Sequence, residues 1–241
     1  WYKEAACQNK WDFATEKMPA NAVTLYAKWE ANTYSIDFNA NGGAGTMASQ
    51  AFVYDTAQEL ETNKFTKEGY TFKGWSTTAN GQVVYTDGAT VNNLTATNHG
   101  TVTLYAVWEA NQYTVTFKDW DGSVLKTEQV AYNTGATAPT EPSREGYRFT
   151  GWDKTFGVIT GDTEITAQYV KTWTVTFKDE DGTVLKAEIV DEGTGATAPT
   201  EPVKEGYTFA GWNAAFDNVT ADTEVTATYI INQYTVTFKD W

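Results

Sequence analysis

The sequence predicts a mainly β protein built from small tandem modules, and three observations support this. The pattern G-Y-x-F-x-G-W occurs three times, beginning at Gly69, Gly146 and Gly206. The segment GATAPTEP at 135–142 returns unchanged at 195–202, a shift of 60 residues. Apolar and polar residues alternate in runs such as Y-T-V-T-F, the period of a half-buried strand. A period this long and regular indicates an array of similar modules.

The aromatic pattern predicts the central strand of each module. Tyr147 and Phe149 are two residues apart, so an extended strand points both to one face. Gly151 either leaves room for a neighbour or marks a bulge that returns Trp152 to the core. Because these aromatic positions recur in every copy, we expect them to form the core.

The other elements of the second copy follow in order. Residues 113–117 alternate as a strand, and Asp121-Gly122 predicts a hairpin to the apolar run that follows. Two prolines in 134–142 exclude a central strand, and Pro142 can start one helical turn over 143–145. Thr163–Tyr169 is the last strand. The unit therefore reads as strand, strand, helical turn, strand, strand.

The first copy has a longer middle segment. Asn80-Gly81 precedes the apolar residues 83–85, and Asp87-Gly88 follows, which predicts an extra short strand or hairpin. Its last strand, 101–108, is apolar on both faces. We expect one face in the core and the other covered by the insert or by a neighbouring repeat.

The repeats divide the chain into five segments joined by short connections. Residues 1–32 match the C-terminal part of a truncated repeat, and 234–241 match the first strand of a further one. Between them lie full copies at 33–110, 113–170 and 173–231. The connections lack Gly, Pro and Ser-rich runs, so they are not flexible spacers. We therefore expect a semi-rigid, elongated string of modules, stabilised by neighbouring repeats of the same chain and forming a window on a longer protein.

Composition excludes several classes of function. The net charge of −14 disfavours nucleic acid and anionic membrane surfaces as partners. No apolar run is long enough to span a bilayer, so no membrane insertion is expected in this segment. Cys7 is the only cysteine, so no disulfide forms within the chain. No signal peptide is visible.

The sequence offers no set of catalytic residues. His99 is the only histidine, which excludes a Ser-His-Asp triad and a zinc site with several histidines. Carboxylate pairs such as Asp162 and Glu164 recur 60 residues later, as solvated loop residues would. The ingredients of a Lys–Asn isopeptide cross-link (Lys118, Lys178, Asn133, Glu128) are common, and Asn133 becomes glycine in the next copy. We expect no enzyme and no cofactor.

The acidic turns at Asp119 and Asp179 resemble the start of a calcium loop. An EF-hand needs a glutamate at position twelve, where this chain has Val130 and Val190. The hairpin turn is the favoured interpretation, and calcium binding is left open.

The full repeat skeleton, Y-x-V-x-F-x-x-x-D-G…A-P-T-x-P-x-x-x-G-Y-x-F-x-G-W…T-x-Y, resembles the Listeria–Bacteroides repeat, which includes the internalin B-repeat. Residues 113–170 and 173–230 resemble its short form, and 34–108 its longer form. The resemblance implies a β-grasp-like (ubiquitin/SUMO-like) α+β module with a helix on the sheet. The Pro-rich segment leaves room for at most a short helix. The resemblance also implies a bacterial cell-surface protein, wall-attached or secreted, in which the repeats are non-catalytic and act as a stalk or in adhesion.

Aromatic residues that differ between copies are candidates for ligand binding. Trp120 lies at a hairpin turn where the third copy has Glu180, and Trp241 has the same offset in the last fragment. An exposed indole can stack on a sugar or anchor a protein. The alternative function is therefore a module that binds an extracellular glycan or host glycoprotein through these residues. The alternative interpretation of Trp120 and Trp241 is that each is a lone exposed aromatic without a binding role, or that it packs on the adjacent repeat.

Overall fold

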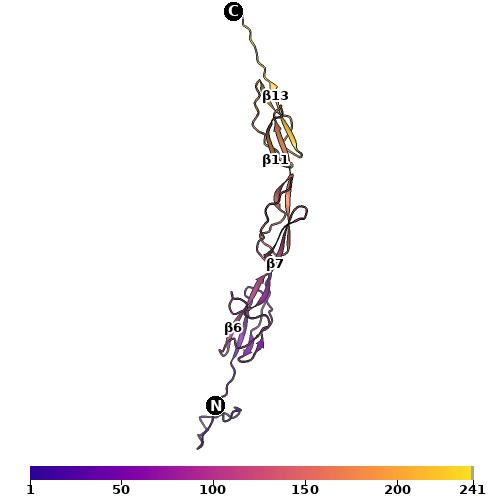
Figure 1. The fold of residues 1–241 in the computed structure, drawn as a ribbon. Helices are drawn as coiled ribbons and strands as arrows, with labels where there is room; N and C mark the ends of the chain where they lie inside the picture. Colours follow the sequence, from indigo (N-terminus) through magenta and orange to yellow (C-terminus); the bar gives the residue numbers. More distant parts are fainter. Residues whose placement is uncertain (240–241) are drawn as a thin grey trace. The chain divides into compact units, whose positions relative to one another are not determined.

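The computed structural model describes residues 1–239, and the chain forms two compact units, 1–111 and 112–241. The described residues are mainly β and contain no helix (Figure 1). The first unit contains β1 (Thr33–Asn39), β2 (Gln50–Val53), β3 (Gln58–Glu59), β4 (Tyr70–Ser76), β5 (Thr90–Val91) and β6 (Gly100–Ala110). The second contains β7 (Gln112–Lys118), β8 (Val124–Ala131), β9 (Tyr147–Trp152), β10 (Thr163–Lys178), β11 (Val184–Asp191), β12 (Tyr207–Trp212) and β13 (Thr223–Ile231).

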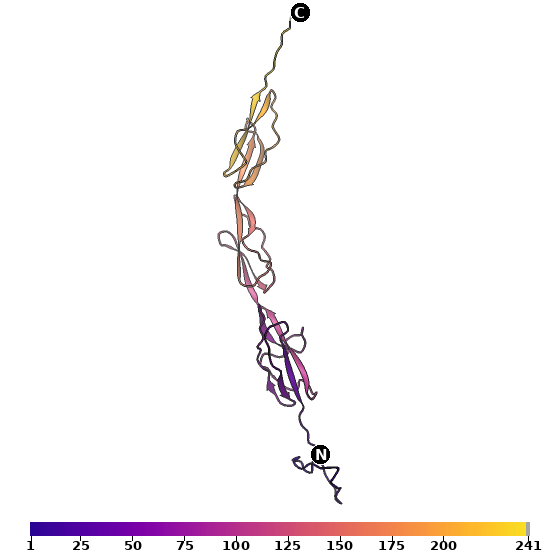
Figure 2. The ribbon, with the colours of Figure 1, turned by 180° about the vertical axis from the view of Figure 1, so that it is seen from behind.

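The three full copies share one sheet topology. In the first copy the order is β2-β1-β6-β4, with β1 and β6 parallel at the centre. The second copy repeats it as β8-β7-β10-β9, and the third as β11-β10-β13-β12. The first and last strands of each copy are therefore central, and the hairpin partner and the aromatic strand lie outside them (Figure 2).

Each copy has its own core beneath this sheet. The inward residues of the central strands are fully buried, as at Val115, Phe117 and Ile165 in the second copy. Phe117 packs against Trp152 with ring centroids 5.0 Å apart. The third copy repeats the arrangement with Phe177 and Trp212 at 5.1 Å. The alternation in the sequence thus predicts the buried face correctly.

The glycine of the aromatic strand marks a bulge. The register of β9 against β10 shifts at this point, and Gly151 has a φ of 130°, which favours glycine. A Cβ on Gly151 would meet nothing within 4 Å. In the first copy, a Cβ on Gly74 would lie 2.5 Å from the Tyr85 carbonyl oxygen. The bulge is thus common to the copies. In the first copy, Gly74 is also needed because the neighbouring segment lies too close for a Cβ.

The predicted helical turn at 143–145 is wrong, as is the implied helix on the sheet. A hydrogen-bonded turn joins Arg144 to Tyr147 instead, with the Tyr147 N–H 3.1 Å from the Arg144 carbonyl oxygen. Gly146 has a φ of 73°, suited to a tight turn. The prolines at 139 and 142 remove two backbone donors, so this segment runs as a loop.

Strand β10 spans the short joint expected between the copy that ends at residue 170 and the copy that begins at residue 173. It runs without a break from the last strand of the second copy into the first strand of the third. Thr163–Thr166 pair with β7 in one copy, and Thr172–Lys178 pair with β11 in the next. One strand is therefore shared by two four-stranded arrangements.

The insert of the first copy forms a minimal pairing rather than a full hairpin. Tyr85 makes an isolated bridge with Trp75, and the short strands β3 and β5 pair with each other. Trp75 is completely buried in the core of this copy. On β6, Leu104 and Ala106 are fully buried, while Val102 and Trp108 pack against the core.

The flanking segments contain little strand. In residues 1–32, Tyr26 forms one bridge with Tyr2, although 23–29 match a strand of the first copy. This segment has no counterpart of the first strand, which is the parallel partner of the last strand in the full copies. Residues 232–239 also form no strand.

Candidate functional site

The hairpin tip of the second copy carries a stack of aromatic rings around a cation. The Arg144 guanidinium carbon lies 3.7 Å from the ring centroid of Trp120 and 3.6 Å from that of Tyr147. The β7–β8 hairpin positions Trp120, the turn before β9 positions Arg144, and Tyr147 is the first residue of β9. Trp120 remains 53% exposed. Arginine on aromatic faces is a favourable cation–π arrangement that leaves its in-plane N–H donors available.

The other copies show how this tip varies. In the third copy, Glu180 replaces Trp120 and forms an ion pair with Lys204, which lies 4.1 Å from the Tyr207 ring. In the first copy, Lys67 lies 4.4 Å from the Tyr70 ring. The cation on the first tyrosine of the aromatic strand is thus common to all three copies. Two of these tyrosines are half-buried, the third is exposed, and none belongs to a core cluster, so the prediction that every aromatic of the pattern lies in the core is wrong for them.

The acidic residues of the tip act as turn caps. Asp119 accepts hydrogen bonds from the Trp120 N–H at 2.8 Å and the Tyr169 hydroxyl at 2.7 Å. Asp121 accepts one from the Ser123 N–H at 2.9 Å. Hydrogen bonding from Ser123 holds the pKa of the Asp121 carboxyl below its usual value. These contacts are those of an Asx-type turn that closes a hairpin.

A second feature lies where the second and third copies join. A pocket of about 420 Å³ opens beside the middle of β10. It is lined by Glu145, Gly146, Tyr147, Lys171, Thr172, Trp173, Thr174, Ile189 and Asp222. The ammonium of Lys171 lies 3.7 Å from the Trp173 ring centroid. Tyr147, which stacks on Arg144, is therefore shared by the tip and the pocket.

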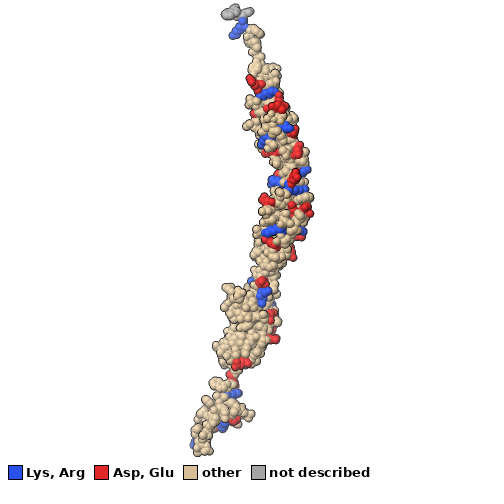
Figure 3. Space-filling view, viewed as in Figure 1, with Lys and Arg blue, Asp and Glu red and all other residues tan. Residues whose placement is uncertain are grey.

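A salt bridge also links the two copies at this junction. Arg148 of β9 donates two hydrogen bonds to Asp191 of β11, one of them 2.9 Å long from Nε to Oδ1. This guanidinium holds the pKa of the Asp191 carboxyl below its usual value. On the face shown in Figure 3, basic and acidic side chains are interspersed over both copies.

The remaining candidates have structural roles. His99 lies in a turn, with its ring nitrogen Nδ1 3.2 Å from the Thr33 hydroxyl. Lys118 and Lys178 form ion pairs with Glu164 and Glu224. No group of three or more His, Cys, Asp or Glu residues that could hold a metal occurs among residues 1–239. Trp241 lies outside the described residues.

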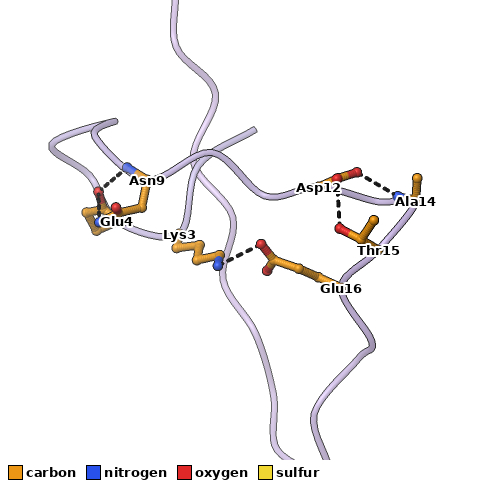
Figure 4. A network of polar contacts seen from close by, with 7 residues as sticks. All are labelled: Lys3, Glu4, Asn9, Asp12, Ala14, Thr15 and Glu16. Atoms are coloured by element: carbon orange, nitrogen blue, oxygen red, sulfur yellow. Dashed lines mark hydrogen bonds and ion pairs between the residues drawn. The ribbon is translucent and has the colours of Figure 1, made fainter.

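A compact polar network organises the start of the chain (Figure 4). Glu4 accepts hydrogen bonds from Asn9, Asp12 accepts them from Ala14 and Thr15, and Lys3 forms a 2.7 Å ion pair with Glu16. These bonds close local turns in a segment with little strand.

Sequence reasoning found Trp120 but missed Arg144, Lys171 and Trp173. A signal was present for the first of these. Between copies, Trp120 becomes Glu180 while Arg144 becomes Lys204, so a stacking pair is replaced by an ion pair. The pocket gave no such signal, because it depends on a strand that crosses the repeat boundary.

Comparison with known proteins identifies the family. The model of the Listeria-Bacteroides repeat domain matches residues 1–28, 34–107, 113–170 and 173–236. The chain belongs to this family. The G-Y-x-F-x-G-W strands and the shared topology are therefore features of Listeria-Bacteroides repeats in this protein.

Relatives of this repeat protein include a membrane protein by name and an internalin. It is 30% identical over 247 residues to a protein of Evansella cellulosilytica named as a Gly-rich membrane protein, covering 92% of this chain and 28% of that protein. It is 39% identical over 111 residues to Internalin H of Listeria monocytogenes, covering 46% of this chain and 19% of that protein. The chain thus spans less than a third of either relative. Within residues 1–239 no helix has the length and apolar character needed to cross a bilayer.

Two solved structures also share limited similarity with the chain. Domains 3–4 of the streptococcal SHIRT repeats of a cell surface protein match with a TM-score of 0.22 and 17% identity, over 57% of this chain and 96% of that one. Mub-RV matches with a TM-score of 0.15 and 14% identity, over 51% and 99%.

Proposed function

We propose that this repeat region is a non-catalytic, semi-rigid stalk of a bacterial cell-surface protein. The observation that carries the proposal is β10, a single 16-residue strand that belongs to two successive repeats. A bend at this boundary would break strand pairing on one or both sides, which makes the joint stiff. A stiff joint suits a spacer that holds another domain away from a cell wall.

Several further observations support a stalk of β-grasp-like modules outside the cell. In each copy the first and last strands are central and parallel, which suits the β-grasp arrangement. The Arg148–Asp191 bridge adds a contact between neighbouring repeats. Family membership and the similarity to Internalin H favour a wall-attached or secreted protein.

Small-angle X-ray scattering of the whole chain tests the stalk. The proposal predicts the profile of an extended particle, because the repeats follow one another through stiff or short joints. A compact, globular profile would contradict it. Scattering at several protein concentrations separates the shape of the monomer from association between copies.

A second candidate function is adhesion to a saccharide or glycoprotein at the hairpin tip. It is favoured by Trp120, whose indole is 53% exposed although one side is covered by Arg144. An exposed indole of this kind can stack on a sugar ring. The test is whether the Trp120→Ala variant remains folded but no longer binds a saccharide or glycoprotein that the unmodified chain binds. Unchanged binding by this variant would contradict adhesion at the hairpin tip.

A further inference from the structure

The tip and the junction pocket together form a ladder of aromatic rings and cations in the second copy. Its members are Trp120, Arg144, Tyr147, Lys171 and Trp173. Tyr147 connects the two halves, because it stacks on Arg144, pairs with Lys171 across β9 and β10, and lines the pocket. We call these five residues the aromatic–cation ladder.

The two cations of the ladder differ from most basic residues around them. In residues 112–231 the ion-paired basic residues are Lys118, Lys126, Arg148, Lys178, Lys186 and Lys204. Among the described residues, Arg144 and Lys171 form no ion pair and no side-chain hydrogen bond, although the chain carries 31 acidic residues against 17 basic ones. Their donors are held in place by aromatic rings and are left available to an external acceptor.

The third copy shows what such a cation binds when a carboxylate is within reach. There Glu180 occupies the position of Trp120 and its carboxylate pairs with Lys204, the counterpart of Arg144. In the second copy the same position holds an indole, while the tip carboxylates Asp119 and Asp121 accept turn hydrogen bonds and form no ion pair with Arg144. A carboxylate from another molecule would complete the arrangement.

The pocket favours a saccharide as the carrier of that carboxylate. Its volume of about 420 Å³ lies in the range of small-molecule sites. The exposed indole of Trp120 offers an apolar face for a sugar ring at the tip, while Glu145 and Asp222 in the pocket can accept hydrogen bonds from hydroxyl groups. Hydroxyls, apolar ring faces and repeated carboxylates occur together in an acidic polysaccharide.

We propose that the aromatic–cation ladder binds a polysaccharide segment that carries carboxylates, with Arg144 and Lys171 each holding one carboxylate. This proposal rests on the second candidate function, adhesion at the hairpin tip, and extends it to the junction pocket and to a ligand class. Arg144 can hold a carboxylate through two parallel N–H donors, and Lys171 acts as a point charge.

Titration of the whole chain with oligogalacturonides, followed by the indole N–H signals in NMR, tests the ligand class. The same oligomers with methyl-esterified carboxyls are the matched neutral probe. We expect the free acids to shift the Trp120 and Trp173 signals and the esters to bind at least about tenfold more weakly. Equal binding of acids and esters, or no binding of either, would overturn the proposal.

Variants test the residues. Arg144→Gln and Lys171→Gln are each expected to weaken binding of the free acids about tenfold. Lys204→Gln, at the equivalent position of the third copy, should leave binding unchanged, and all three should keep the wild-type backbone spectrum. If Lys171→Gln binds normally while Trp120→Ala does not, binding by the whole ladder is contradicted, whereas adhesion at the hairpin tip is still supported. If Trp120→Ala also binds normally, the tip candidate fails too.

Discussion

At the residue scale, the hydroxyl of Tyr169 ties the last strand of the second copy to the tip of its first hairpin. Burial and the hydrogen bond to Asp119 raise the pKa of Tyr169 to about 12, from an ordinary value of 10. The third copy repeats the bond between Tyr229 and Asp179, with the same direction of shift. In the first copy the indole N–H of Trp108 donates to the Ala40 carbonyl oxygen at 2.9 Å. This tie is therefore part of the repeat.

The tie predicts a loss of stability at high pH. A raised pKa means that the neutral phenol is favoured more strongly in the folded state than in the unfolded state. Its contribution is complete below pH 10 and is lost as the pH rises through about 12. Phenolate absorbance of the folded chain should include the titration of Tyr169 and Tyr229 near pH 12, and Tyr169→Phe should reduce the absorbance change near that pH by the amount of one tyrosine. Titration of all tyrosines near pH 10 in the folded chain would contradict this account.

At the element scale, the aromatic strand depends on one glycine for its bulge. Gly151→Ala is expected to cost about 1–2 kcal/mol, because φ is positive while the space around Cβ is open. Gly74→Ala should cost more, since its Cβ would also collide with the Tyr85 carbonyl oxygen. Native-state hydrogen exchange of β9 and β4 measures each cost in its own repeat. Equal costs at the two positions would show that the collision is relieved by a shift of the insert.

The strands could largely be predicted from the sequence, because alternation and turn chemistry act locally. Tyr113–Phe117, the Asp121-Gly122 turn and Thr163–Tyr169 all lie in the predicted elements. The helical turn after Pro142 could not be excluded in the same way, since a proline permits both a first helical turn and a loop. The wrong placement of Tyr147 has a related cause. Recurrence shows that a residue has the same role in every repeat. It does not distinguish a core contact from a stack on a cation, because both recur.

At the scale of the whole molecule, the boundary between the second and third repeats was the feature least visible in the sequence. From Tyr169 to Trp173 the spacing is four residues, whereas Trp108 to Tyr113 and Tyr229 to Tyr234 are five apart. Side chains in a strand alternate with a period of two, so the even spacing lets one strand carry both aromatics on the same face. The junction pocket and the pairing of Arg148 with Asp191 follow from that continuous strand.

The central claim is that β10 joins these two repeats into one stiff body, and pulsed electron–electron resonance measures this directly. Nitroxide labels at Thr150→Cys on β9 and Ala210→Cys on β12, in a Cys7→Ser background, occupy equivalent exposed strand positions 60 residues apart. We expect one narrow distance distribution, and a broad one after insertion of Gly-Ser-Gly between Lys171 and Thr172. A distribution in the uninterrupted chain as broad as that of the insertion variant would contradict the claim.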